Sequence, residues 1–245
     1  MTRPFRFALL SLLLGLLLWA SPAAAQVNVS ADLMSRYVWR GFDFGESFSI
    51  QPDLSYTNGG FTVGTWASYS IAADGSGANE HDLYVGYAIG PVSVGLTDYY
   101  FPSPVGVEGV PDGAKFFNYD NEGAGAHYLE PSLSVTGPAS FPVTVTGAIV
   151  AYNAPDNPVY LEAAVPFTVE GVEMGVAAGG VIVSPDDGAV DDFYGLPESA
   201  FTKVGLSATK AIPITDTFEL PISAQFIVNP YTERTFLVFG VSLSP

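Results

Sequence analysis

Apolar and polar residues alternate in short runs along most of the chain after residue 25. In the clearest run, every second residue from Phe218 to Val228 is apolar and those between are polar or small, except Ile227. A period of two residues is typical of a β-strand with one apolar and one polar face. Such runs predict twelve strands, over residues 27–40, 47–57, 60–72, 80–90, 91–101, 125–136, 141–153, 157–169, 171–184, 200–211, 216–229 and 233–244.

The connections between these strands alternate in length. Tight turns are predicted at Asn58-Gly59, Gly90-Pro91, Gly137–Ser140, Glu170-Gly171 and Pro213–Thr215. Longer, mostly acidic connections are predicted near 41–46, 73–79, 102–124, 185–199 and 229–232. Short turns at one end and long loops at the other are typical of outer-membrane barrels. The pattern predicts an all-β fold, a closed antiparallel up-and-down transmembrane β-barrel of about 12 strands, with both termini at the short-turn end.

The composition favours this barrel over a soluble sandwich. Only 13% of residues are charged, against about 25% in a typical soluble domain, so the second face of the strands has too little charge for a water-exposed surface. A barrel turns its apolar face to lipid and its polar face to the lumen, and closure leaves no unpaired backbone in hydrocarbon. A soluble secreted ligand-binding β-sandwich is the competing fold.

The first residues predict export from the cytoplasm. Arg3 and Arg6 precede an apolar stretch over 7–19, and Ala23–Ala25 offers a small-residue cleavage site. The stretch is shorter than the roughly 20 residues that a spanning helix needs, so we expect a signal peptide over 1–25 and a barrel domain over 26–245. The chain has no cysteine, which excludes disulfides and thiolate sites.

The polar face is predicted to line the lumen and carries seven acids but only three bases. Net negative walls attract cations, and this face predicts a porin-like channel for passive passage of small hydrophilic solutes or cations. The same acids can instead pair within a closed barrel with a structural, adhesion or receptor role through its acidic loops. The candidate pore-lining residues are Asp32, Arg36, Arg40, Asp53, Trp66, Asp82, Tyr84, Tyr128, Glu130, Tyr160, Glu162, Glu173, Lys203 and Glu219.

Three features of the connections carry narrower expectations. Arg40 is predicted to pair with Asp43, Glu46 or a lumenal acid, and Gly41 to serve a turn. The long connection 102–124 either folds into the barrel mouth or packs on its rim. Clustered carboxylates can hold Ca²⁺, but the loop 185–199 lacks the spacing of a calcium loop, so a solvated acidic loop is favoured over a metal site. The weak candidates there are Asp186, Asp187, Asp191 and Asp192.

Other function classes have little support in the sequence. Loss of Arg3 and Arg6 with the leader would take the net charge from −17 to −19, which opposes binding to nucleic acid. His81 and His127 are the only histidines, and no Gly-x-Ser-x-Gly motif is present. We therefore expect neither an enzyme nor a bound cofactor.

Two motifs in the first half resemble a known family. Residues 35–41 read Ser-Arg-Tyr-Val-Trp-Arg-Gly, and Gly60-Phe61 is followed by Gly64 and Trp66. From about 27 to 162 the chain resembles the TorF family of predicted porins. The resemblance implies a barrel in the outer membrane of a Gram-negative cell, in contact with outer-membrane lipid and inserted by the barrel-assembly machinery. Pro245 stands where such barrels commonly present an aromatic residue to that machinery.

Overall fold

The computed structural model describes residues 26–73, 77–102, 115–121, 125–154, 156–183, 189, 191 and 193–244. The predicted signal peptide lies outside the described residues. Within them, no helix is long and apolar enough to cross a membrane.

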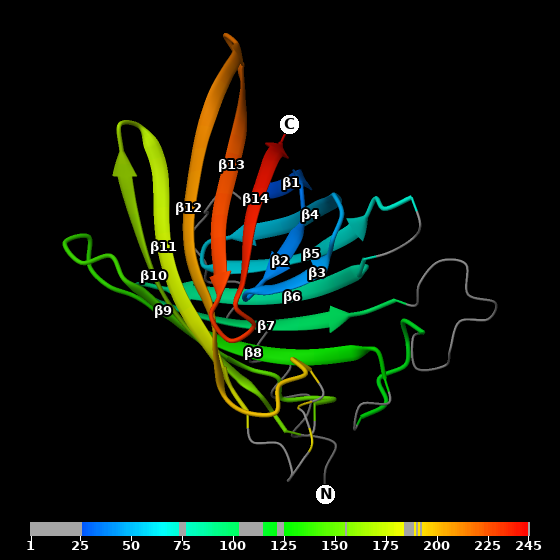
Figure 1. Ribbon diagram of the computed structural model, residues 1–245. Helices are drawn as coiled ribbons and strands as arrows, with labels where there is room; N and C mark the ends of the chain where they lie inside the picture. The colour runs from blue at the N-terminus through cyan, green and yellow to red at the C-terminus, as the bar shows by residue number, and fades with distance from the viewer. Residues whose placement is uncertain are drawn as a thin grey trace, which may run out of the picture.

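Twelve of the strands described form a closed antiparallel barrel (Figure 1). Each strand pairs with its neighbours along the wall, and β1 closes the ring between β4 and β14, where Val29 lies opposite Leu54 and Leu33 opposite Val241. The predicted fold class is confirmed. The barrel strands are β1 (Gln26–Met34), β4 (Ser49–Asn58), β5 (Phe61–Ser70), β6 (Glu80–Ile89), β7 (Val92–Tyr100), β8 (His127–Thr136), β9 (Thr144–Ile149), β10 (Val159–Val169), β11 (Val172–Ile182), β12 (Ala200–Thr215), β13 (Phe218–Asn229) and β14 (Arg234–Leu243).

The two faces of the wall differ in the way that the alternation predicts. Large apolar side chains at every second position are exposed on the outside of the barrel, where they form an apolar belt; examples from seven strands are Val63, Leu83, Leu96, Leu133, Leu161, Val176 and Leu237. Ile227, the exception in its run, is buried with Phe236 and Val238. It faces inward, so an apolar patch lies inside the barrel.

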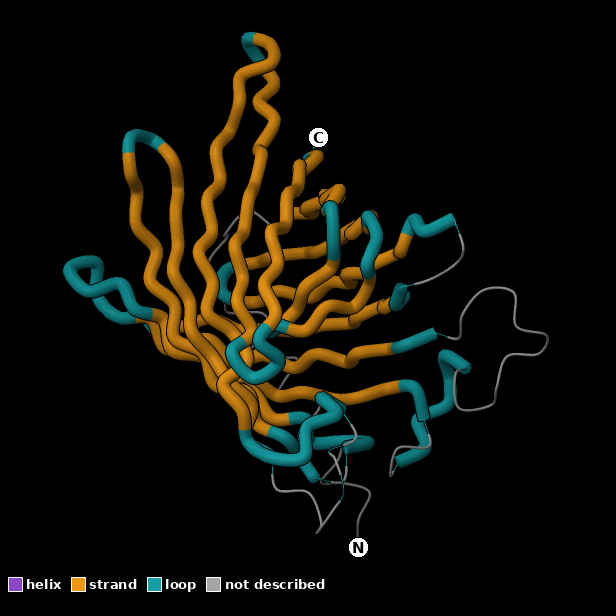
Figure 2. Tube along the Cα trace, in the orientation of Figure 1, coloured by secondary structure: helices purple, strands orange, loops and turns teal. Residues whose placement is uncertain are grey.

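Short turns join the strands at one end, as Figure 2 shows for β10–β11 and β12–β13. Glu170 and Gly171 both have positive φ, 48° and 75°, as a two-residue type I′ hairpin requires. The turn predicted at Pro213–Thr215 is wrong, because β12 continues to Thr215. The pairing with β13 becomes irregular between Pro213 and Thr215, and this irregularity accommodates a proline, which has no N–H for the ladder.

The predicted first strand, 27–40, is too long. β1 ends at Met34, and Ser35 still binds β14 through Phe239, with its N–H donating to the carbonyl at 2.7 Å. The chain then leaves the wall and forms a separate sheet of β2 (Tyr37–Trp39) and β3 (Phe42–Gly45). Arg40 and Gly41 form the turn with φ of 51° and 87°, again the type I′ geometry. The connection predicted at 41–46 is therefore largely strand.

Candidate functional site

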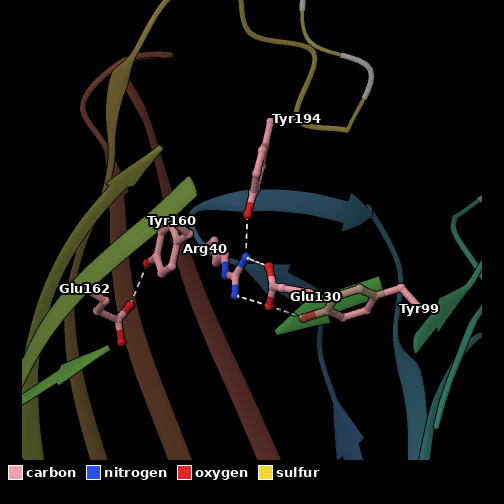
Figure 3. Close-up of polar contacts among 6 residues, drawn as sticks. All are labelled: Arg40, Tyr99, Glu130, Tyr160, Glu162 and Tyr194. Carbon is pink, nitrogen blue, oxygen red and sulfur yellow. Dashed lines mark hydrogen bonds and ion pairs between the residues drawn. The ribbon is translucent and has the colours of Figure 1, made fainter. Parts of the chain in front are cut away.

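The tip of the β2–β3 hairpin is fixed to the barrel wall by Arg40. Its guanidinium makes two hydrogen bonds to Glu130 on β8, Nη1 to Oε2 at 2.6 Å and Nη2 to Oε1 at 2.8 Å (Figure 3). Tyr99 on β7 donates to Oε1 of the same carboxylate at 2.9 Å. Two-pronged arginine–carboxylate pairs are stronger and more directional than hydrogen bonds between neutral side chains. These bonds therefore hold the tip of the hairpin, at Arg40, in one position against β8.

Arg40 keeps its charge in this buried position. Burial alone would lower the pKa of the guanidinium, but the hydrogen bonds to Glu130 and the nearby tyrosines outweigh it, so the pKa is raised. The guanidinium also lies over the rings of Trp39 and Tyr160, at 4.1 and 4.3 Å from their centroids. Such cation–π contacts favour the charged form. A fixed positive charge therefore stands inside the barrel.

The polar contacts continue beyond Arg40 along the wall. Tyr160 on β10 donates to Glu162 at 2.6 Å (Figure 3), and Lys203 on β12 binds the same carboxylate at 2.8 Å. Positive and negative groups thus alternate from β8 to β12. This arrangement satisfies Glu130 and Glu162, two of the predicted lumenal acids, with the bases Arg40 and Lys203.

Further contacts tie the hairpin to other parts of the barrel. Tyr37 donates to Glu80 on β6 at 3.0 Å, and Val38 packs on the inward apolar patch that contains Ile227. Asn229 at the end of β13 donates to the Gly41 carbonyl at 3.1 Å, and a Cβ at Gly41 would overlap the Thr202 carbonyl of β12. The hairpin therefore reaches β6, β8, β12 and β13, and it occupies the lumen rather than projecting from it.

Aromatic side chains cover the hairpin tip from the loop that precedes β12. Trp39 stacks on Tyr194 with 5.8 Å between centroids and 7° between planes, and contacts Phe193 edge-on. Arg40 also donates from Nη1 to the hydroxyl oxygen of Tyr194. Burial raises the pKa of the Tyr194 phenol although Arg40 opposes the shift, so Tyr194 accepts this hydrogen bond as a neutral phenol.

Asp191 shapes this loop. Its two carboxylate oxygens accept the backbone N–H groups of Phe193, Tyr194 and Leu196 at 2.6–3.0 Å. These bonds use the carboxylate that the sequence offered as a metal ligand. Asp186, Asp187 and Asp192 lie outside the described residues, and the residues that are described contain no group of three or more His, Asp or Glu that could hold a metal ion.

The structure brings five predicted site residues into this network: Arg40, Glu130, Tyr160, Glu162 and Lys203. Asp53 and Tyr84 form a separate pair at 2.7 Å. The register places Asp32, Trp66, Asp82 and Tyr128 on the same inward face, whereas Glu173 and Glu219 lie near the short turns.

Two predicted wall residues are corrected. Arg36 and Arg40 belong to the inserted segment, where Arg36 pairs with Asp43 and Arg40 with Glu130. Four members of the site were not predicted from the sequence: Tyr37, Glu80, Tyr99 and Tyr194. Glu80 could have been predicted from the sequence, because it lies two residues before Asp82 on one strand and so shares its inward face.

The described part of the 102–124 connection packs on the outer rim. His127 binds Asp98 through Nδ1 at 2.8 Å and the Phe116 carbonyl through Nε2 at 2.6 Å. Tyr119 stacks on His127 at 3.9 Å and donates to Asp98 at 2.7 Å. Asp98 and His127 alternate with the inward positions of β7 and β8, so residues 115–121 cover the outside of the wall.

Comparison with known proteins identifies the family. Residues 19–213 match the Gcw_chp family model, which is described as a bacterial protein of unknown function. No curated protein matches the chain. The matched range includes the inserted hairpin and most of the wall that it contacts. Because this match covers well over half of the sequence, the chain belongs to the Gcw_chp family of bacterial proteins.

Proposed function

We propose that this protein is a porin-like channel of the bacterial outer membrane that passes small hydrophilic solutes and prefers cations. The observation that carries the proposal is a lumen lined by charged and polar groups around an inserted hairpin, within a wall whose outer face is apolar. The proposal assigns the protein no catalytic reaction.

The outer face supports a position in the membrane. A belt of exposed apolar side chains would be unfavourable in water, whereas lipid solvates it and closure of the barrel pairs the backbone of every wall strand. Outer-membrane lipid is therefore the proposed surrounding. Export through a cleaved leader and insertion by the barrel-assembly machinery are the route that this position requires.

The lumenal charges support the preference for cations. Arg40 and Lys203 are each paired with an acid. Among the described residues, no base pairs with Asp32 or Asp53, which share the inward face. An excess of unpaired carboxylates lowers the energy of a cation in the lumen and raises that of an anion.

The hairpin also supports a second candidate, a closed barrel that acts through its loops. Its contacts with β6, β8, β12 and β13 are equally compatible with a plug that closes the lumen and with a constriction that only narrows it. Ion conductance distinguishes the two functions, because only a channel conducts ions in the resting state.

Single-channel recording in a planar bilayer separates the candidates. The protein, purified in detergent and shown to be folded by heat-modifiable gel mobility, is added under a KCl gradient. Discrete conductance steps with a reversal potential toward that of K⁺ support the channel. Folded protein without steps overturns it and favours the closed barrel.

A further inference from the structure

Two acids of β6 are buried side by side beneath the hairpin. Glu80 is 2% exposed and Asp82 7% exposed. They are two residues apart on a strand, so both side chains point into the barrel. Tyr37 of the hairpin covers the pair by donating to Glu80 at 3.0 Å.

Among the residues that the structure describes, no base is paired with either of these two carboxylates. Arg36, Arg40 and Lys203, the bases nearest the lumen, are bound to Asp43, Glu130 and Glu162 respectively. Burial of a charged carboxylate without a partner is strongly unfavourable. Two adjacent acids in this position are therefore neutralised either by protons or by a cation from outside the chain.

Two buried oxygen atoms without hydrogen-bond partners belong to residues next to Glu80. Ser68 is directly opposite Glu80 across the β5–β6 ladder, is 0% exposed, and its hydroxyl has no hydrogen-bond partner. The Oδ1 atom of Asp82 is likewise buried and without a partner. Both are oxygen atoms with free lone pairs, and their residues are the neighbours of Glu80 across the ladder and along the inward face of β6. This is a set of ligands suited to a hard cation.

We propose that Glu80, Asp82 and Ser68 bind one Ca²⁺-like divalent cation, which ties the β5–β6 wall to the hairpin through Tyr37. A divalent ion neutralises both carboxylates at once. Ca²⁺ accepts irregular sets of oxygen ligands, which water can complete, whereas Mg²⁺ demands a regular octahedron. This inference does not require the barrel to conduct.

Luminescence of Tb³⁺, used as a stand-in for Ca²⁺, tests the site in the protein purified in detergent. Trp66 lies opposite Asp82 in the ladder and 5.5 Å from the Tyr37 ring, so excitation of the tryptophan sensitises an ion bound there. We expect saturable Tb³⁺ emission at pH 7 that excess CaCl₂ displaces. Glu80→Gln and Asp82→Asn should each abolish it.

Two further variants keep the test decisive. Glu219→Gln removes a predicted lumenal acid near the short turns and should leave the emission unchanged. Ser68→Ala retains both acids and should weaken Tb³⁺ affinity several-fold, which gives a readout even if a carboxylate variant does not fold. Absence of saturable emission from the folded wild type, or equal emission from the Glu80 and Asp82 variants, overturns the proposal and assigns the neutralising charge to a shared proton.

Discussion

Arg40 at the tip of the inserted hairpin and Glu130 on the β8 wall are 90 residues apart in sequence and are joined by two hydrogen bonds. This pair fixes the position of a segment that leaves the wall after β1 and returns at β4. The effective width of the lumen therefore depends on contacts made by a few side chains.

Replacing Glu130 by Gln should release the hairpin tip. Loss of one member of a buried ion pair costs about 3–5 kcal/mol, and Arg40 would keep its charge without its carboxylate. We expect faster hydrogen exchange across residues 37–45 by mass spectrometry. Glu219→Gln is the matched control and should exchange like the wild type. Unchanged protection in Glu130→Gln would show that other contacts hold the hairpin.

Gly41→Ala should displace the hairpin for a steric reason. The φ of 87° is unfavourable for alanine, and the added Cβ would overlap the Thr202 carbonyl. Gly59→Ala is the control, since its φ is 61° and a Cβ there meets no atom within 4 Å. The control should cost only about 1–2 kcal/mol of stability, for the left-handed backbone of an alanine. Equal urea unfolding midpoints for the two variants would contradict the close approach at Gly41.

Ion selectivity should follow the lumenal charges. Asp53→Asn removes an acid that accepts a hydrogen bond from Tyr84 but has no base partner in the described residues, so the K⁺/Cl⁻ permeability ratio should fall. Lys203→Gln leaves Glu162 without its base, so the ratio should rise. Reversal potentials under a KCl gradient measure both, and shifts of the same sign would argue against an electrostatic origin.

His127→Ala should loosen the outer rim without altering the lumen. It removes hydrogen bonds to Asp98 and to the Phe116 carbonyl, and the stacking of Tyr119. We expect limited proteolysis to cut sooner within 115–121, while single-channel conductance keeps its wild-type value. A change in conductance would mean that this segment reaches the mouth of the barrel.

Adjacent residues of β11 test which face meets lipid. Val176 is exposed on the outer face and Ala177 points inward. An arginine on the lipid face of a membrane barrel costs about 2–4 kcal/mol near the midplane. Val176→Arg should therefore reduce folding into lipid vesicles, whereas Ala177→Arg should fold more readily. The reverse order would invert the assignment of faces.

The strands of the barrel wall could be predicted from the sequence, but the inserted hairpin that forms the site could not. The two-residue period determines which side chains face outward, so the strand count and both faces followed from local pattern. The inserted hairpin did not, because Tyr37 and Trp39 continue the alternation of β1 and extend the apparent strand to Arg40. Only pairing with distant residues, such as Glu80 and Glu130, distinguishes a strand inside the barrel from one in its wall.

Conductance of the wild type beside Glu130→Gln in planar bilayers tests the central claim most directly. If the hairpin is the constriction of a channel, the wild type shows small cation-selective steps and the variant shows larger ones. Two folded proteins that both fail to conduct, or that conduct identically, would contradict this account.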